Sequence, residues 1–206
     1  MITENKAHWE KVYQTKSADQ VSWTQEYPQL AIDYLKELNL PKDVAIIDIG
    51  GGEAAFAEAA MDLGYTNISV LDISEAALAK AKERLGTRAE NIKWIVIDIL
   101  DFETTELYDF WYDRAVFHFL TDEKHINKYI EIVTKFLVEK GNFLLGTFSE
   151  TGPFKCSGLE ITQYSENSMK ETFAKNFVAE KCFTQEHKTP FDSIQNFQFC
   201  GFKKIK

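Results

Sequence analysis

Glycines and carboxylates follow the ends of short apolar segments in the first half of the sequence. The apolar segment 44–49 is followed by three glycines: Gly50, Gly51 and Gly52. Glycine lets the backbone turn sharply and brings a ligand close to the start of a helix. Asp72 lies twenty residues after Gly52, where its carboxylate can accept hydrogen bonds from both hydroxyls of a ribose. Asp98 ends a later apolar segment and can accept from an exocyclic amino group. The spacing predicts a site for a nucleoside-containing ligand.

Asp48 and two isoleucines refine this prediction. Asp48 lies inside the first apolar segment, where a buried carboxylate is unfavourable unless a cation or a hydrogen-bond donor meets it. An ammonium group on the ligand would explain this acid, whereas a dinucleotide-binding strand is normally apolar there. Ile73 and Ile99 follow Asp72 and Asp98 and are placed to hold a flat base between them. Each acid alone could instead cap a helix or end a strand in solvent, but their shared placement favours ligand binding.

Alternating apolar and helical patterns must position these residues. The predicted strands are short apolar segments, of which 44–49 is rich in β-branched residues: 44–49, 67–71, 92–97, 109–112 and 142–147. The helices between them are predicted at 54–63, 75–85 and 122–137. Strands joined through helices run parallel, and their apolar character implies cover on both faces. The last third predicts a helix near 165–175 and two strands, 177–184 and 195–202, which are antiparallel because their connection is short.

In order and spacing, these motifs resemble the class I, seven-stranded S-adenosylmethionine-dependent methyltransferases. Asp48-x-Gly50-x-Gly52 is similar to the family's first motif, and Asp72 and Asp98 are similar to its ribose-binding and adenine-contacting acids. Ala54 departs from the family, since many members carry a third glycine there.

The resemblance continues in segment 108–120, which is similar to the fourth-strand segment beneath the methionine end of the cofactor, and this implies a cofactor contact for Asp113. It also implies S-adenosylmethionine as cofactor and S-adenosylhomocysteine as product. Ser-Trp near the start and His-x-Thr-Pro near the end are similar to a poorly characterised bacterial branch and fix no substrate.

The fold class that follows is α/β: a doubly wound, mostly parallel seven-stranded sheet of the Rossmann-like methyltransferase type, with an antiparallel strand near one edge. We expect one domain over residues 1–206, with a helical leader or lid at 1–40, a cofactor-binding core at 41–150 and a substrate-side part at 151–206.

Candidates for catalysis and for acceptor binding come from segments expected on the ligand side of the sheet. His118 follows the fourth predicted strand and can act as a general base or have a structural role. His187, Thr189 and Gln195 surround the turn between the last two strands and can contact substrate or form a plain exposed turn. Arg114 either pairs with its neighbour Asp113 or meets an anionic substrate. Further substrate candidates are Tyr13, Trp23 and Cys156.

Two other classes of protein stay open at this point. The glycine turn followed by Asp72 also satisfies the fingerprint of an NAD(P)-dependent oxidoreductase, although Asp48 and Asp98 count against it. A non-catalytic S-adenosylmethionine-binding module is the other alternative, because no unmistakable base stands out. For a methyltransferase, we expect a small-molecule or protein side-chain acceptor, since Asp113-Arg114-Ala115-Val116 replaces the Asn-Pro-Pro-Tyr of base-modifying enzymes.

Composition excludes several partners. The net charge is -9 and no Lys/Arg cluster stands out, so we expect no nucleic-acid partner. No apolar run is long enough to cross a bilayer and the start lacks the apolar core of a signal peptide, so we expect a cytoplasmic protein without a membrane partner. Cys156, Cys182 and Cys200 lack metal-ligand spacing, and we expect them to be reduced and to bind no metal. The oligomeric state is not predicted.

Overall fold

The computed structural model describes residues 2–205 and divides them into two compact units. The first unit contains the described residues up to Ser17 together with Gln25–Glu103. The second unit contains Ala18–Thr24 and the chain from Thr104 onward. The segment expected as a continuous leader is therefore shared, because residues 18–24 belong to the second unit. The prediction of a single domain stays a prediction.

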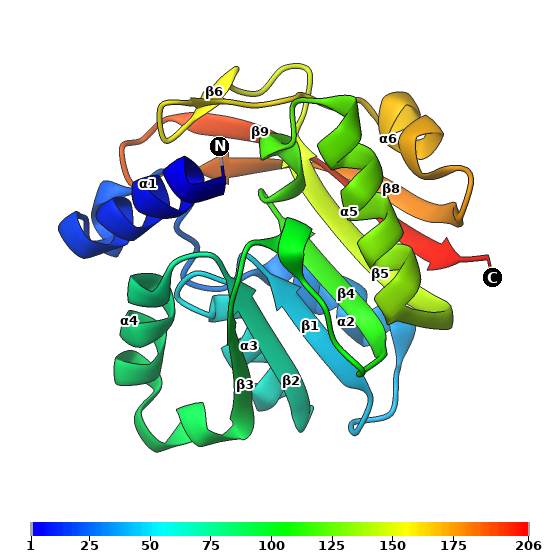
Figure 1. Cartoon of the computed structure of the whole chain (residues 1–206), viewed down its shortest axis with the longest axis horizontal. Coiled ribbons are helices and arrows are strands. Elements are labelled where there is room, and N and C mark those ends of the chain that lie inside the picture. The colour runs from blue at the N-terminus through cyan, green and yellow to red at the C-terminus, as the bar shows by residue number, and fades with distance from the viewer. Residues whose placement is uncertain (1, 206) are drawn as a thin grey trace. The chain divides into compact units, whose positions relative to one another are not determined.

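Three parallel strands form the sheet of the first unit, in the order β3-β2-β1. They are β1 (Ala45–Ile49), β2 (Asn67–Asp72) and β3 (Ile92–Val96). The helices are α1 (Ile2–Thr15), α2 (Gln29–Leu38), α3 (Ala55–Asp62) and α4 (Glu75–Leu85), with short 3-10 turns η2 (Gly86–Asn91) and η3 (Ile99–Asp101). Figure 1 shows α4 beside β2 and β3. The carboxyl ends of these parallel strands lie at the same edge of the sheet, so the residues that follow β1 and β2 lie close together.

The helix α4 begins with two side-chain contacts that the sequence places far apart. Ser74 is the N-cap, and its hydroxyl accepts from the Ala77 N–H at 3.1 Å. Glu10 of α1 adds a carboxylate at the same end, accepting from the Ser74 hydroxyl at 2.9 Å and from the Ala76 N–H at 3.2 Å. A negative charge at a helix N-terminus is favourable, so Glu10 joins α1 to α4.

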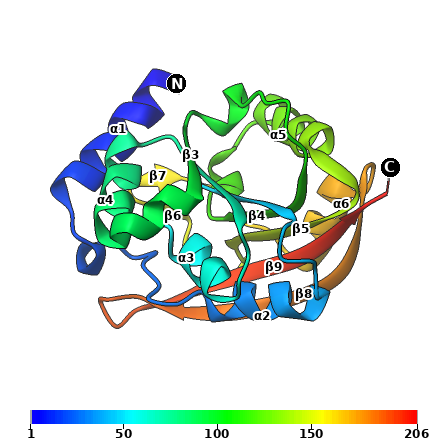
Figure 2. The same cartoon turned by 90° about the horizontal axis from the view of Figure 1, so that it is seen from below.

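Four strands form the main sheet of the second unit, in the order β4-β5-β9-β8. β4 (Tyr108–Arg114) and β5 (Leu137–Phe148) are parallel, whereas β9 (Ile194–Lys204) is antiparallel to both β5 and β8 (Phe177–Lys188). Figure 2 shows β8 and β9 side by side over their length. The remaining elements are η1 (Ala18–Gln20), η4 (Phe117–Phe119), α5 (Glu123–Phe136), α6 (Glu166–Phe173) and a small sheet of β6 (Lys155–Cys156) and β7 (Leu159–Glu160).

Aromatic side chains fill the core of the second unit. Phe143 of β5 stacks on Phe202 of β9 with ring centroids 5.7 Å apart, and Phe173 of α6 packs against both. All three rings are fully buried. Offset and edge-on contacts of this kind add to the free energy gained by burying apolar area.

The predicted class, a mostly parallel seven-stranded α/β sheet with an antiparallel strand near one edge, is confirmed. The last two strands are longer than predicted, because their alternating pattern continues through polar residues. Among the described residues, no helix combines the length and apolar character needed to span a membrane.

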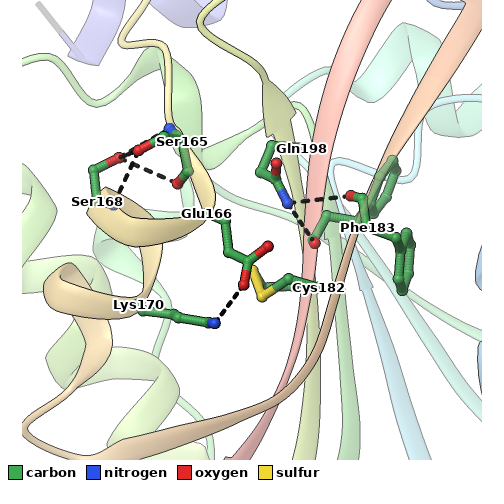
Figure 3. The surroundings of a disulfide bond; sticks show 9 residues. Ser165, Glu166, Ser168, Lys170, Cys182, Phe183 and Gln198 are labelled. Carbon is green, nitrogen blue, oxygen red and sulfur yellow. Dashed lines mark hydrogen bonds and ion pairs between the residues drawn. A yellow bond between two sulfur atoms is a disulfide. The ribbon is translucent and has the colours of Figure 1, made fainter.

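The expectation of three reduced cysteines is wrong for two of them. Cys182 and Cys200 lie directly opposite each other on β8 and β9, with Cα atoms 4.1 Å apart, and form a disulfide. They are eighteen residues apart in sequence, and only the hairpin brings them together. Figure 3 shows the bond beside Gln198, whose amide donates to the carbonyls of Phe183 and Phe199 at 3.2 and 3.0 Å. Cys156 is free and buried.

Candidate functional site

The turn after β1 is held against the end of β2 by backbone and carboxylate contacts. Gly50 and Gly52 have φ angles of 64° and 53°, which a side chain would make unfavourable. The N–H groups of Gly50 and Gly51 donate to the Leu71 carbonyl at 2.7 and 3.1 Å. The Gly52 N–H donates to Oδ2 of Asp72 at 2.9 Å. The two groups of residues that the sequence singled out are therefore in direct contact.

Ala54 occupies the position where a third glycine was expected. It adopts a left-handed conformation with φ 62° and starts α3, and its N–H donates to the Gly51 carbonyl at 2.7 Å. A left-handed conformation is less favourable for alanine than for glycine, so this position keeps the backbone geometry for which glycine is suited.

Asp72 is buried and its two oxygens bind different backbone groups. Oδ2 accepts from Gly52 and Oδ1 accepts from the Ser74 N–H at 2.9 Å. Burial raises the pKa of Asp72 to about 6, although its hydrogen bonds to Ser74 and Gly52 oppose this rise. A carboxylate offers about four lone-pair positions, so Asp72 keeps acceptor capacity for two ligand hydroxyls.

Asp48 and Tyr13 limit the space around the glycine turn. A Cβ added to Gly51 would lie 2.8 Å from Oδ2 of Asp48, and one added to Gly52 would lie 2.6 Å from the Tyr13 hydroxyl. Asp48 is buried, as predicted. The Tyr13 hydroxyl thus lies beside the glycine turn, and a substrate contact for Tyr13 stays a prediction. These close approaches explain why both positions need glycine.

Asp98 and its hydrophobic neighbours complete the candidate site of the first unit. Oδ1 of Asp98 accepts from the Leu100 N–H at 2.9 Å, so this acid caps η3. Its other oxygen is not involved in that cap, and the side chain is half-buried. Ile73 is half-buried and Ile99 is buried. A role in holding a base stays a prediction for these three residues.

In the second unit, Asp113 has a structural environment. It is fully buried at the end of β4, and its Oδ2 accepts from the Tyr129 hydroxyl at 2.6 Å. Its Oδ1 accepts from the Val116 N–H at 2.9 Å and, at 3.4 Å, from the Phe117 N–H. Burial raises the pKa of Asp113 to about 6. These contacts join β4 to α5, and the cofactor contact of Asp113 stays a prediction.

The expected ion pair between Arg114 and Asp113 is wrong. Neighbouring residues of a strand point to opposite faces, and Arg114 points away from Tyr129. Its Nη1 donates to the Trp23 carbonyl at 2.9 Å, and its guanidinium lies 4.6 Å from the ring centroid of Phe197. Nε and Nη2 are buried without a hydrogen-bond partner.

His118 accepts one hydrogen bond through a ring nitrogen and leaves the other ring nitrogen without a partner. Its Nδ1 accepts from the Phe148 N–H at 3.3 Å, which assigns the ring proton to Nε2. That Nε2 is buried and has no partner. Burial, assisted by the charge of Arg114, lowers the pKa of His118 to about 3, so the ring is neutral near pH 7. The catalytic role stays a prediction, and the structure supports donation rather than proton abstraction.

The other candidates of the second unit differ in their freedom to bind substrate. His187 pairs through Nε2 with the Ser22 carbonyl at 2.7 Å, and burial lowers its pKa. The Thr189 hydroxyl accepts from Phe191 and Ser193 N–H groups, so it organises the β8–β9 turn. Burial raises the pKa of Cys156 to about 12, which keeps the thiol protonated.

Sequence reasoning missed several partners of these residues. The carbonyls of Ser22 and Trp23 bind His187 and Arg114, and Tyr129 holds Asp113. Carbonyl groups carry no residue-specific signal. The helical pattern of 122–137 predicts that Tyr129 is helical but not that its hydroxyl reaches a strand sixteen residues earlier.

Comparisons with known proteins identify the family of the chain. The profile of a family described as "Methyltransferase domain" matches residues 40–198. The eEF1A lysine and N-terminal methyltransferase of Mus musculus is 28% identical over 139 residues, covering 66% of this chain and 19% of that protein. Malonyl-[acyl-carrier protein] O-methyltransferase 2 of Ilyobacter polytropus is 29% identical over 111 residues, covering 53% of this chain and 41% of that protein. The chain thus spans less than half the length of these two relatives.

A solved structure shows the same fold over the whole chain. It is the N-methyltransferase NodS from Bradyrhizobium japonicum in complex with S-adenosylhomocysteine, with a TM-score of 0.75 and 19% identity. The match covers 98% of this chain and 100% of that chain. The predicted family resemblance, which was based on the glycine turn and its acids, is confirmed by the family profile.

Proposed function

Since the chain belongs to the methyltransferase domain family, whose cofactor is S-adenosylmethionine, we propose that it transfers a methyl group to a small molecule or to a protein side chain. When bound, S-adenosylmethionine supplies a methyl group on a positively charged sulfur, and S-adenosylhomocysteine remains after transfer. The observation that carries the proposal is the glycine turn of the first unit, which Asp72 holds through the Gly52 N–H at 2.9 Å.

The residues of the first unit fit this cofactor. The space that a Cβ would fill at Gly51 and Gly52 lets backbone approach a ligand closely. Asp72 would accept from the ribose hydroxyls, and the buried carboxylate of Asp48 would meet the ammonium group of the methionine part. Ile73 and Ile99 would hold the adenine, with Asp98 at its amino group. An acid at Asp48 favours this cofactor over a nicotinamide dinucleotide.

The candidate bases of the second unit limit the chemistry of the acceptor. His118 has a pKa of about 3 with its Nδ1 already accepting a hydrogen bond, and Cys156 has a pKa of about 12. Neither side chain takes up a proton readily near pH 7. We therefore expect an acceptor that presents its nucleophile without help, such as a thiolate, a carboxylate or an amine that loses its proton to water.

The relatives differ in the acceptors that their names give. One is named for lysine and N-terminal methylation, the other for O-methylation of malonyl-[acyl-carrier protein]. Both acceptor classes therefore stay within the proposal. A cytoplasmic location and the lack of a nucleic-acid partner also stay predictions.

Thermal unfolding with S-adenosylhomocysteine tests the cofactor site. We expect a rise in Tm for the wild type and little or none for Asp72→Asn, because an amide cannot replace a carboxylate that accepts from four donors. Asp33→Asn on the exposed face of α2 is the matched control and should respond like the wild type. Stabilisation by NADH, with none by S-adenosylhomocysteine, would overturn the proposal. Release of S-adenosylhomocysteine from S-adenosylmethionine with any member of an acceptor library separates an enzyme from a binding module.

A further inference from the structure

Arg114 is a half-buried cation, and two of its guanidinium nitrogens are buried without a hydrogen-bond partner. Its guanidinium donates one hydrogen bond to the Trp23 carbonyl and lies against the face of Phe197, and it forms no ion pair among the described residues 2–205. Nε and Nη2, which lie on the same edge of the guanidinium, have no partner and no exposure to solvent. A buried charge without a counter-ion is destabilising, and buried arginines are normally paired. The arrangement therefore calls for an anion from outside the chain.

The unpartnered edge has a defined chemical preference. Nε–H and one Nη–H of arginine form two parallel donors, which match the two oxygens of a carboxylate. Phe197 covers the face of the guanidinium and leaves this edge as the free one. Nη1 already donates to the Trp23 carbonyl, so the Nε–Nη2 edge is the one left for a ligand.

Further groups of the second unit complement an anion at this position. The Nε2–H of His118 is also buried without a partner. The His118 ring lies 4.8 Å from Phe148, whose ring lies 4.8 Å from that of Phe197, the residue against which Arg114 packs. The net charge of the chain is -9, so the protein as a whole repels anions and a local cation is needed to hold one.

We propose that Arg114 binds a carboxylate group of the methyl acceptor through Nε and Nη2, with the Nε2–H of His118 as an additional donor. This inference rests on the proposed methyltransferase function and names the acceptor class as carboxylic acids. Because Nε and Nη2 are shielded, the ligand enters when a covering segment moves. Ala18–Thr24 contacts Arg114 through Trp23 and His187 through Ser22.

Matched pairs of acids and amides test the proposal on the full chain saturated with S-adenosylhomocysteine. The probes are benzoate and hexanoate against benzamide and hexanamide, with phenyl phosphate as a third arm, and the readouts are Tm and calorimetric affinity. We expect the carboxylates to stabilise the wild type and the amides to have no effect. Arg114→Gln should weaken carboxylate binding at least tenfold without changing the affinity for S-adenosylhomocysteine. Arg114→Lys should also weaken it, because lysine keeps the charge but loses the paired donors.

Two controls separate this role from a structural one. Arg88→Gln removes an arginine that pairs with Glu58 and Asp62, and it should bind carboxylates like the wild type. Arg114→Met keeps the length of the side chain but removes the unpaired charge, so its Tm in the absence of ligand should equal or exceed that of the wild type. A large loss of Tm in Arg114→Met would assign Arg114 to the structure and overturn the proposal.

The remaining outcomes are equally decisive. Equal effects of acids and amides, or carboxylate binding unchanged in Arg114→Gln, would overturn the proposal while leaving methyl transfer intact. Tighter binding of phenyl phosphate than of benzoate would overturn the carboxylate as the ligand group of Arg114 and favour a phosphate. Failure of the wild type to bind S-adenosylhomocysteine would refute the proposed function itself.

Discussion

Replacing Tyr129 with phenylalanine removes one hydroxyl from a buried polar pair and leaves the aromatic packing in place. The Tyr129 hydroxyl donates to Oδ2 of Asp113 at 2.6 Å and accepts from Trp111 Nε1 at 3.3 Å. Its ring lies 4.9 Å from that of Phe117, a contact that phenylalanine keeps. A hydrogen bond to a charged group contributes about 1.5–3 kcal/mol, and losing the longer bond from Trp111 adds up to about 1 kcal/mol. We expect Tyr129→Phe to lower the free energy of unfolding by about 2–4 kcal/mol at pH 7.

The pH dependence of this loss follows from the pKa of Asp113. Burial raises that pKa from 3.8 to about 6 in the folded protein, so the folded state binds a proton that the unfolded chain releases between about pH 4 and 6. Asp113 therefore lowers the free energy of unfolding as the pH rises through this window. Without the Tyr129 hydroxyl the folded pKa rises further, and each added unit costs about 1.4 kcal/mol at pH 7. The difference between Tyr129→Phe and the wild type should be larger at pH 7 than at pH 5.

Urea unfolding followed by far-ultraviolet circular dichroism at both pH values measures this difference. Tyr164→Phe is the matched control, because the Tyr164 hydroxyl is buried without a partner and its removal should be neutral or stabilising. Equal stability of the two variants at pH 7 would refute the assignment of Asp113 to the structure. An equal cost at pH 5 and pH 7 would refute its titration near pH 6.

Two further predictions concern the first unit. The pKa of about 6 for Asp72 predicts that the affinity for S-adenosylhomocysteine falls by roughly tenfold between pH 7 and pH 5, because ribose hydroxyls donate to the ionised carboxylate. Calorimetry measures this change. The same measurement on Asp72→Asn should show weak binding that does not change over this pH range. Gly52→Ala should lower the free energy of unfolding by about 1–2 kcal/mol because of its φ of 53° alone. The new Cβ would also lie 2.6 Å from the Tyr13 hydroxyl, and Tyr13→Phe should remove this second loss. Urea unfolding of the two single variants and the double variant tests this, and losses that simply add would contradict it.

The sequence predicted the first unit well because its signals are local. Gly50, Gly52 and Asp72 lie next to strand ends, and parallel strands bring such ends to one edge. The contact between Gly52 and Asp72 follows from this topology, as does the burial of Asp48 within an apolar strand.

The second unit was predicted less well because its partners are distant in the sequence. The hydroxyl that holds Asp113 comes from a helix, and the groups that meet Arg114 and His187 are carbonyls of a segment about ninety or more residues away. The pairing of Cys182 with Cys200 depends on the register of two strands, which cysteine spacing alone does not contain.

Asp113 and Arg114 show how strand geometry separates a structural charge from a functional one. As neighbours in a loop or helix end, the two side chains could have neutralised each other. On β4 they point to opposite faces, so each needs a partner of its own. Asp113 accepts hydrogen bonds from Tyr129 and from two backbone N–H groups. Among the described residues, Arg114 donates to one carbonyl and packs against an aromatic ring. The positive charge of Arg114 therefore lies on the same face of the sheet as Phe197, where a ligand carboxylate would neutralise it.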